Sequence, residues 1–519
     1  MSESSPAGGI GEQQGLDRRV LAVGGVVILG MIMAMLDITV VNIAIAHLID
    51  EFDTTLETIQ WVATGYTLAL ATVIPLSGWA ADRFGTKRIY LAAIAMFMIG
   101  STLAGFAWSA ESLIVFRVLQ GLGGGMLMPL GMTILTKAAG PHRVGRVMSV
   151  LGVPMLLGPI IGPILGGWLV DSGNWRVIFF LNIPIGLISL ALGAKILDAD
   201  EPRPTERLDV LGLLLLSPGL AALIYGLAKI PEYGGVGYAE VFLPGGIGAL
   251  LVIGFVLHAM RTPNALIDLK LFKDRAFAVA SVALVLFATA FMGAMLLVPL
   301  FFQNVRGEGA LDAGLLMAPQ GIGAMLMMPI AGIIVDRVGA SRIAPFGIIV
   351  IVASLLVFTQ LEADTSYVLI CGSLFVMGMG MGMTMMPIMS AALKTLRQND
   401  VARASTSLNI IQQVAGSIGT ALLSVLLATS IKDNLPPAPP GSPAPTGGGL
   451  QGLPDAIREQ VAPFLADAFS STFVWAVILV GLSIIPALLL PKGKAAVPPP
   501  PPAADTDREP ELVPEGERR

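Results

Sequence analysis

The sequence predicts an all-α polytopic membrane protein, and three observations support this fold class. Of the 519 residues, 55% are hydrophobic and only 13% are charged, with a mean hydropathy of +0.79, a composition atypical of soluble proteins. Fourteen apolar segments are each long enough to cross a bilayer. A charged glycine motif in the first half recurs in the second half, which indicates two related helical bundles.

The fourteen segments follow a polar N-terminus, residues 1–19, that we expect to be disordered and cytoplasmic. Their centres lie near residues 34, 69, 98, 124, 158, 187, 219, 251, 290, 324, 352, 380, 418 and 481. We assign six segments to an N-terminal bundle (20–197) and six to a C-terminal bundle (276–491). The remaining two form an extra helix pair between the bundles (209–260).

Four connections have a composition of their own. Residues 198–208 form a charged cytoplasmic link, and residues 261–275 form an amphipathic cytoplasmic linker that we place at the membrane surface. The outer loop, 432–470, begins as a Pro/Gly tract and continues as a short amphipathic helix. The proline-rich tail, 492–519, is expected to be disordered and cytoplasmic.

The distribution of basic residues predicts the orientation in the membrane. Lysines and arginines gather in the N-terminus, the tail and every second connection, and the opposite side carries only Arg176, Lys229, Arg306, Lys432 and Arg458. By the positive-inside rule, both termini are cytoplasmic. The polar N-terminus has no short apolar core followed by a cleavage site, so we expect no cleaved signal peptide.

Several function classes receive no support from the sequence. The single cysteine, Cys371, excludes an internal disulfide, and three scattered histidines argue against a metal site. No nucleotide-binding P-loop and no nucleophile–base pair is present, so we expect no ATP hydrolysis and no catalytic residues. We therefore expect no enzyme, no cofactor, no metal and no nucleic-acid partner.

Asp37 is the residue around which the functional hypothesis is built. It lies within an apolar run from about Val20 to Leu48, where a lone acid costs about 2.5–3.5 kcal/mol on insertion scales. A carboxylate can take up and release a proton, so we interpret Asp37 as a proton-binding residue of a transporter. The alternative is a structural acid satisfied by a neighbouring Thr, Asn or Arg. Thr39 and Asn42 lie near it on helix one.

Arg117 is the one basic residue well inside an apolar segment. Its guanidinium keeps its proton in practice, so it cannot be the proton carrier itself. We predict that it controls the charge state of a nearby acid. The alternative is a structural hydrogen bond to carbonyls at a helix break. Gln120 and Met128 lie near the same helical face.

The fifth segment carries a ridge of glycines beside two prolines. Gly158, Gly162 and Gly166 recur every four residues, which lets another backbone approach closely. Prolines bend helices or interrupt their hydrogen bonding. The segment suits a pivot between the bundles or a tight static contact, and both interpretations remain open. Its predicted functional residues are Gly158, Pro159, Gly162, Pro163, Gly166 and Gly167.

The repeated motif ends the second helix of each bundle. We predict an inner gate in which its aspartate pairs with a basic residue across the seam in one conformation, with Arg143 and Arg146 as candidate partners of Asp82. The alternative is a topology signal with a tight turn. The gate residues are Gly78, Asp82, Arg83, Gly85 and Arg88 in the first copy, and Asp336, Arg337 and Gly339 in the second.

The substrate cavity is predicted from weaker signals. Methionines recur every four residues around Met381, and flexible methionines suit a pocket for varied apolar shapes, although core packing explains them as well. Asn409, Gln412 and Gln413 form a polar stripe that could contact substrate or join helices. The full predicted set is Asn42, Gln120, Met128, Met381, Asn409, Gln412 and Gln413.

These motifs together resemble the major facilitator superfamily, and more narrowly the fourteen-helix drug:proton antiporters of the QacA/EmrB type. The resemblance covers about residues 20–490, and the order and spacing of the motifs are highly specific. The motifs that match are Leu36 to Ala44, Gly78 to Arg88, Arg117 to Gly121, Gly158 to Gly167, Trp175 to Gly186, Leu208 to Gly212 and Leu266 to Phe272. Ala46, Thr86 and Ser149 depart from the family pattern without removing a coupling residue.

The resemblance implies two six-helix bundles around a central cavity, in the cytoplasmic (inner) membrane of a bacterium. It implies a proton-coupled multidrug efflux antiporter that exports hydrophobic or cationic small molecules, with protons and membrane lipids as further partners. The alternative within transport is a proton-driven exporter of a lipid or cell-envelope precursor. A membrane sensor or scaffold is the alternative from another class. Whether a periplasmic adaptor docks on the outer loop stays open.

Overall fold

The computed structural model describes residues 17–140, 143–147, 161–162, 165, 175–199, 202, 207–233, 235–262, 265–397, 400–434 and 455–491. Every regular element in these ranges is a helix. Thirteen helical segments are long and apolar enough to cross a membrane, and they coincide with thirteen of the fourteen predicted segments. The remaining one, centred near residue 158, lies mostly outside the described residues. The all-α membrane fold is therefore confirmed.

The helices divide into two bundles and a separate pair. The N-terminal bundle contains α1 (Arg18–Phe52), α2 (Leu56–Phe84), α3 (Thr86–Gly105), α4 (Ala110–Ala139), α6 (Arg176–Phe180) and α7 (Asn182–Ile196). The pair is α8 (Val210–Tyr233) and α9 (Ala239–Arg261). The C-terminal bundle contains α10 (Arg275–Asn304), α11 (Ala310–Val338), α12 (Ala340–Phe358), α13 (Tyr367–Lys394), α14 (Val401–Asn434), α15 (Asp455–Leu482) and α16 (Ile484–Leu488).

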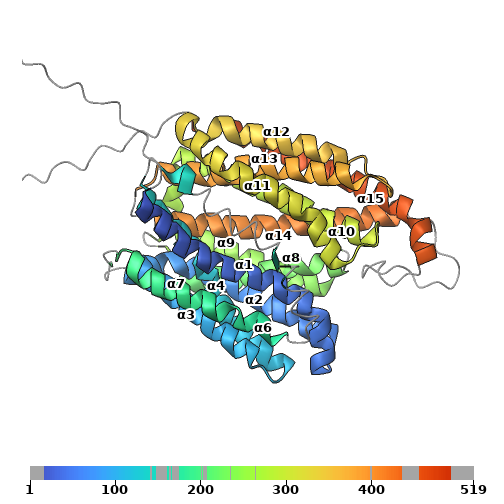
Figure 1. Ribbon diagram of the computed structural model, residues 1–519. Helices are drawn as coiled ribbons and strands as arrows, with labels where there is room; N and C mark the ends of the chain where they lie inside the picture. Colours follow the sequence, from blue (N-terminus) through green and yellow to red (C-terminus); the bar gives the residue numbers. More distant parts are fainter. Residues whose placement is uncertain are drawn as a thin grey trace, which may run out of the picture.

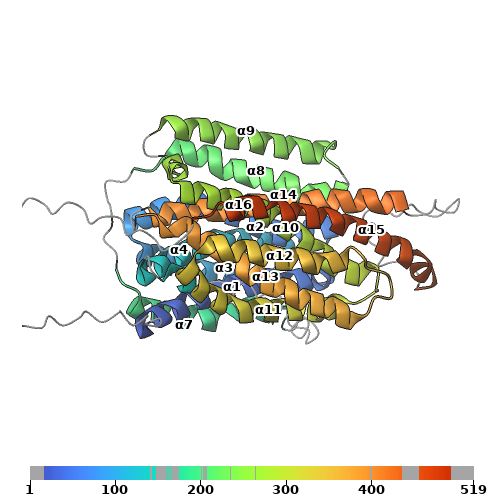
Figure 2. The ribbon, with the colours of Figure 1, turned by 90° about the horizontal axis from the view of Figure 1, so that it is seen from above.

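The extra pair lies against the seam between the two bundles. Figure 1 shows α1 to α7 on one side of the molecule and α11 to α13 on the other, with α14 between them. Seen from above, α8 and α9 form an outer layer beside α14 (Figure 2). Because α8 packs against both α2 and α14, it contacts one helix from each bundle.

The repeated motif produces the same turn in both bundles. Gly85 follows α2 with φ +92°, and Gly339 follows α11 with φ +88°, a conformation that favours glycine. The amide of each glycine donates to a carbonyl four residues earlier, Ala81 or Val335, at 2.9 Å. The internal repeat in the sequence is thus matched by a repeat in the backbone.

The linker 261–275 packs apolar residues against the extra helix pair, and its place at the membrane surface stays a prediction. Leu266 and Ile267 are buried and pack in the same apolar cluster as Phe255 of α9 and Leu216 of α8. A short 3₁₀ helix, η1 (Leu269–Lys273), follows. The apolar side of the linker therefore covers the protein rather than lipid.

Asp209, at the start of α8, fixes this arrangement. Its carboxylate contacts Nε2 of His258 at 2.8 Å and accepts from the amides of Gly212 at 2.8 Å and Leu266 at 3.2 Å. These contacts join the beginning of α8, the end of α9 and the linker. The position of the linker follows from hydrogen bonding as well as from its apolar residues.

The outer connection is also more helical than expected. α14 continues to Asn434 and α15 begins at Asp455, so the expected short amphipathic helix is the first part of the last long helix. The bounds of the outer loop, 432–470, stay a prediction. Residues 435–454, which include the Pro/Gly tract, lie outside the described residues, as do 1–16 and 492–519.

Glycines allow helices to touch backbone to backbone in the C-terminal bundle. A Cβ added at Gly378 of α13 would lie 1.9 Å from the carbonyl oxygen of Gln320 on α11. A Cβ at Gly323 of α11 would lie 2.1 Å from the carbonyl oxygen of Phe375. These glycines are therefore packing residues, as small residues commonly are between membrane helices.

We expect Gly378→Ala to destabilise the protein, because the added methyl group forces α11 and α13 apart. Overpacking typically costs about 1–3 kcal/mol. Gly372→Ala on the same helix is the control, since a Cβ there meets nothing within 4 Å. Thermal unfolding of the purified protein in detergent measures both. Equal melting temperatures for the two variants would contradict this account of the packing.

Candidate functional site

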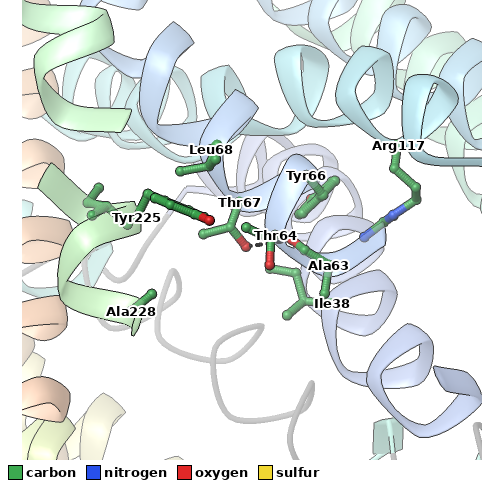
Figure 3. A pocket seen from close by; sticks show the side chains of 10 residues that line it. Ile38, Ala63, Thr64, Tyr66, Thr67, Leu68, Arg117, Tyr225 and Ala228 are labelled. Atoms are coloured by element: carbon green, nitrogen blue, oxygen red, sulfur yellow. Dashed lines mark hydrogen bonds between the residues drawn. The ribbon is translucent and has the colours of Figure 1, made fainter. Parts of the chain in front are cut away.

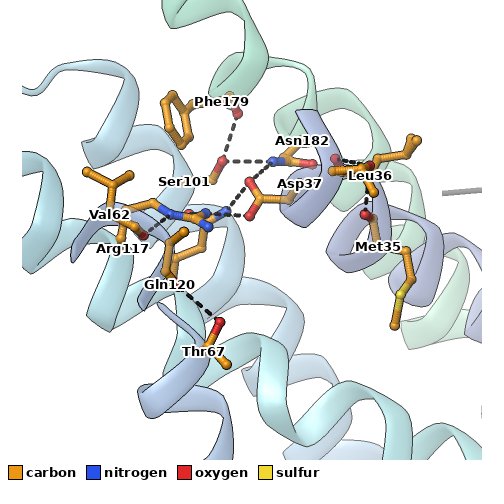
Figure 4. A network of polar contacts seen from close by, with 12 residues as sticks. Met35, Leu36, Asp37, Val62, Thr67, Ser101, Arg117, Gln120, Phe179 and Asn182 are labelled. Atoms are coloured by element: carbon orange, nitrogen blue, oxygen red, sulfur yellow. Dashed lines mark hydrogen bonds and ion pairs between the residues drawn. The ribbon is translucent and has the colours of Figure 1, made fainter. Parts of the chain in front are cut away.

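A buried ion pair joins α1 and α4 at the centre of the N-terminal bundle. The guanidinium Nη1 of Arg117 contacts Oδ2 of Asp37, and the two side chains are 1% and 0% exposed. Gln120 lies beside them, donating through Nε2 to Oδ1 of Asp37 at 2.8 Å and accepting from Arg117 at 2.7 Å. Figure 4 shows the three side chains converging. Asp37 is therefore paired, although it is the only acid in its segment.

A second group of side chains ties this pair to α3, α6 and α7. Asn182, the first residue of α7, donates to Oδ1 of Asp37 at 3.3 Å and to the Ser101 hydroxyl at 2.9 Å. Ser101 in turn donates to the carbonyl of Phe179 at 2.8 Å. The helix is interrupted at Leu181, between α6 and α7, which places the Asn182 side chain toward α1 (Figure 4).

Arg117 is held on its other sides as well. Its Nε donates to the carbonyl of Val62 at 3.2 Å, and its guanidinium carbon lies 4.1 Å from the centre of the Tyr66 ring. The cation therefore has a backbone partner and an aromatic face that do not depend on Asp37. It can stay in place when the charge of the acid changes.

The geometry limits what Asp37 can do chemically. Two amide groups and one guanidinium all donate to its oxygens, so all three contacts use Asp37 as the acceptor. A proton on Asp37 removes the net attraction to Arg117 and takes up one acceptor position. The sequence analysis expected Arg117 to act on a nearby acid, and the structure brings the two together. Proton coupling itself stays a prediction.

The first copy of the repeated motif contacts the C-terminal bundle directly. Nε of Arg403, on α14, donates to Oδ2 of Asp82 at 3.2 Å. One turn earlier, a Cβ at Gly78 would lie 3.0 Å from Oγ1 of Thr406, and the hydroxyls of Ser77 and Thr406 are 3.0 Å apart. This end of α2 is therefore closed against α14.

The second copy makes the reciprocal contact. Asp336, at the end of α11, accepts from the backbone amides of Gly145 at 3.1 Å and Arg146 at 3.3 Å. Nε of Arg146 lies 3.7 Å from the same carboxylate. A Cβ at Gly145 would lie 2.7 Å from Oδ1 of Asp336, so the contact depends on a small residue.

These contacts correct the expected pairing of Asp82. Arg403 takes the place that the sequence analysis gave to Arg143 or Arg146, because α14 rather than the segment after α4 faces the end of α2. Arg143 contacts Asp17 at 2.9 Å, and Arg146 contacts Asp336.

The other predicted gate residues lie at the same helix ends. Arg83 is half-buried, and Arg88 and Arg337 are exposed. Within the ranges that the structure describes, these three arginines form no hydrogen bond or ion pair. The aspartates and glycines of the motif therefore make the interbundle contacts.

Most of the predicted antiport helix belongs to a part of the chain that the structure does not describe. Gly158, Pro159, Pro163, Gly166 and Gly167 lie outside the described residues. Gly162 is described, and a Cβ there would lie 2.1 Å from Oγ1 of Thr39 on α1. This one glycine lets its helix approach α1 two residues from Asp37. The pivot role stays a prediction.

A cavity of about 210 Å³ lies next to the ion pair. Arg117 is the only predicted site residue among those that line it, and residues of α1, α2 and α8 form the rest of the wall (Figure 3). The sequence analysis did not select Tyr66, Tyr225 or Thr67, because each lies in an apolar segment with no distinguishing motif.

The predicted substrate-cavity residues lie elsewhere in the structure. Gln120 belongs to the Asp37 network, Met381 is buried in the core, and Met128 packs against it. Asn409 contacts Met132 at 3.2 Å and the carbonyl of Ser405 at 2.8 Å.

Three further members of the set complete this picture. Oε1 of Gln412 is buried, with no hydrogen-bond partner among the described residues, and Gln413 lies between α2, α8 and α14. The side chain of Asn42 is outside the described part. Substrate contact by these residues stays a prediction.

Asn182 and Arg403 are the site residues that the sequence analysis missed. Asn182 lies within the stretch Trp175 to Gly186, which was noted only as a family-like pattern. Arg403 is one of the basic residues that gather on the predicted cytoplasmic side, and no motif distinguishes it. A polar residue at membrane depth is the signal that could have selected Asn182.

Comparisons with known sequences agree with the architecture. Residues 27–420 match the family described as Major Facilitator Superfamily. The Multidrug resistance protein B homolog of Mycobacterium tuberculosis (strain ATCC 25618 / H37Rv) is 43% identical over 496 residues, covering 93% of this chain and 92% of that protein. The Tetracenomycin C resistance and export protein of Streptomyces glaucescens is 32% identical over 418 residues, covering 79% of this chain and 76% of that protein.

Solved structures show the same fold. The human organic anion transporter MFSD10 aligns with a TM-score of 0.60 at 13% identity, covering 90% of this chain and 100% of that chain. The proton:xylose symporter XylE aligns with a TM-score of 0.56 at 13% identity, covering 91% of this chain and 96% of that chain. At this identity the likeness concerns the fold alone.

We expect Arg117→Met to lower the melting temperature more than the double variant Asp37→Asn/Arg117→Met. Removing one partner of a buried ion pair typically costs about 3–5 kcal/mol, because the other charge is left uncompensated. In the double variant, the carbonyl oxygen of the new amide still accepts from Gln120 and Asn182. Thermal unfolding in detergent measures the melting temperatures of the single and double variants. Arg88→Met, at an exposed position, is the control. A double variant as unstable as the single one would contradict this.

Proposed function

The chain belongs to the major facilitator superfamily, and we propose that it is a proton-coupled antiporter that exports hydrophobic or cationic small molecules. It is a multi-pass membrane protein whose relatives carry the names of multidrug resistance and export transporters. We place it in the cytoplasmic membrane of a bacterium, with both termini cytoplasmic, because basic residues gather on that side.

The buried pair of Asp37 and Arg117 is the observation that carries the proposal. In this conformation three groups donate to the carboxyl oxygens of Asp37. A proton that reaches Asp37 from outside weakens the pair and frees the helices that it joins, α1 and α4. Arg117 remains bound to Val62 and Tyr66, so release of the proton can restore the pair.

The interbundle contacts supply the second part of the mechanism. Asp82 with Arg403, and Asp336 with Arg146, join the ends of α2 and α11 to the opposite bundle. While both contacts hold, this end of the seam between the bundles is closed. Substrate uptake from the cytoplasm or inner leaflet requires both contacts to open.

Proton entry provides enough free energy for export. One charge moving through 100 mV releases about 2.3 kcal/mol. Because about 1.4 kcal/mol corresponds to a tenfold concentration ratio, one proton supports somewhat less than a hundredfold gradient of an uncharged substrate from the membrane potential alone.

Ethidium efflux tests the proposal. In vesicles with an imposed pH gradient, we expect wild type to export ethidium. We expect the gradient-driven export rate of Asp37→Asn to be lower by a factor of about ten or more, a ratio that corresponds to about 1.4 kcal/mol. Asp312→Asn, which neutralises an exposed acid, is the control.

The two other outcomes have different meanings. Gradient-dependent efflux that survives Asp37→Asn would move the proton site to another residue. A wild type that exports no ethidium under any gradient would contradict multidrug export, and a lipid or cell-envelope precursor would then be the substrate to test.

The gate is tested by exchanging its charges. We expect Asp82→Asn to slow export while substrate affinity stays within a few fold, because the residue stabilises a conformation and does not contact substrate. The double variant Asp82→Arg/Arg403→Asp should regain part of the rate, since it restores an opposite-charge pair. Export rates in the same vesicles measure this. Unchanged turnover in Asp82→Asn would refute a gating role.

A further inference from the structure

We propose that the cavity between α2 and α8 is a binding subsite for an uncharged aromatic ring of the exported molecule, and that Tyr225 determines which rings it accepts. The inference rests on the proposed export function and assigns a role to the extra helix pair. The observations that carry it are the position of the cavity, its size, the chemistry of its wall and its contact with Arg117.

The cavity extends from the N-terminal bundle to the extra helix pair. Figure 3 shows Tyr225 directed from α8 toward Thr67 and Leu68 of α2, with Ile38 and Arg117 on the opposite side. A molecule in the cavity therefore touches the extra pair and the Asp37 partner at once. Tyr66 of α2 and Ala228 of α8 also line the cavity.

The volume limits the occupant to a small ring system. The cavity measures about 210 Å³. An apolar cavity of about 150 Å³ in a protein binds benzene, so this space accepts a single ring or two fused rings. A larger substrate places one ring here and its remaining parts outside the cavity.

The wall favours an aromatic and uncharged occupant. Most of its side chains are apolar or aromatic, and its one formal charge, Arg117, is already paired with Asp37. A cation would meet the guanidinium, and an anion would compete with Asp37 for it. The Thr67 hydroxyl donates to the carbonyl of Ala63 at 3.0 Å and keeps its lone pairs available for a donor on the ring.

Tyr225 is held ready for stacking. Its ring stacks on Trp61 of α2, with centroids 5.7 Å apart and planes inclined by 23°. α8 is itself fixed to α2, since the Ser217 hydroxyl donates to the carbonyl of Thr72 at 2.6 Å. A side chain positioned by these contacts loses little freedom when a ligand arrives, which favours binding.

The shared residue Arg117 connects ring binding to the state of Asp37. It lines the cavity through the same guanidinium that holds the acid. A change in one site therefore changes the other, and the coupling is reciprocal for equilibrium binding. The cavity is thus placed where an occupant can influence proton loading.

Direct binding of tritiated 2-naphthol to the purified full-length protein in detergent tests the subsite. The probe is uncharged and has two fused aromatic rings. We expect saturable binding to wild type, and decahydro-2-naphthol, its saturated counterpart, should compete only weakly because it cannot stack. Absence of saturable binding would overturn the proposal.

Variants then assign the binding to this cavity. We expect Tyr225→Ala to weaken binding about tenfold, because it removes the stacking ring, and Tyr225→Phe to keep it within about threefold. Ala228→Phe should abolish binding by filling the space. Tyr238→Ala, at an exposed tyrosine in the connection between α8 and α9, is the control. Equal affinity in wild type, Tyr225→Ala and Ala228→Phe would overturn the assignment.

The binding assay separates this inference from the transport proposal. If vesicles export no ethidium but naphthol binds and depends on Tyr225, the subsite stands and multidrug export fails. If ethidium is exported but naphthol does not bind, export stands and the subsite fails. Asp37→Asn should retain binding and shift its affinity by a measurable factor, and an unchanged affinity would refute the link through Arg117.

Discussion

The pairing of Asp37 with Arg117 is the interaction on which the rest of the structure depends. Two charges removed from water are tolerated only if each has partners of good geometry. Helices α1, α2, α3, α4 and α7 all supply groups to this network, either directly or through Gln120, Asn182 and Ser101. The N-terminal bundle is therefore organised around a buried polar centre.

The two copies of the repeated motif make one structure from two symmetric halves. Asp82 reaches α14, and Asp336 reaches the segment after α4, so each bundle contributes an acid and a base. Glycines 78 and 145 lie at the points of closest approach. The two ion pairs share no residue, so the bundles are joined at two separate places.

The sequence predicted the fold well because hydropathy reports helices that must satisfy their backbone internally. It also identified Asp37, Arg117 and the motif aspartates, since charged residues in or beside apolar segments are costly. Partners were harder to predict. The choice of Arg403 over Arg146 depends on which helices face each other across the seam. The place of Tyr225 in the cavity wall depends on where α8 packs, and no local sequence pattern predicts that position.

The attachments of α8 have a mechanical consequence. Through Ser217 it is bonded to α2, and through Leu220 it shares an apolar cluster with Ile410 of α14. Its beginning is tied by Asp209 to the linker that leads into α10. Any separation of the two bundles would have to break one of these sets of contacts. The extra helix pair therefore acts as a brace across the seam.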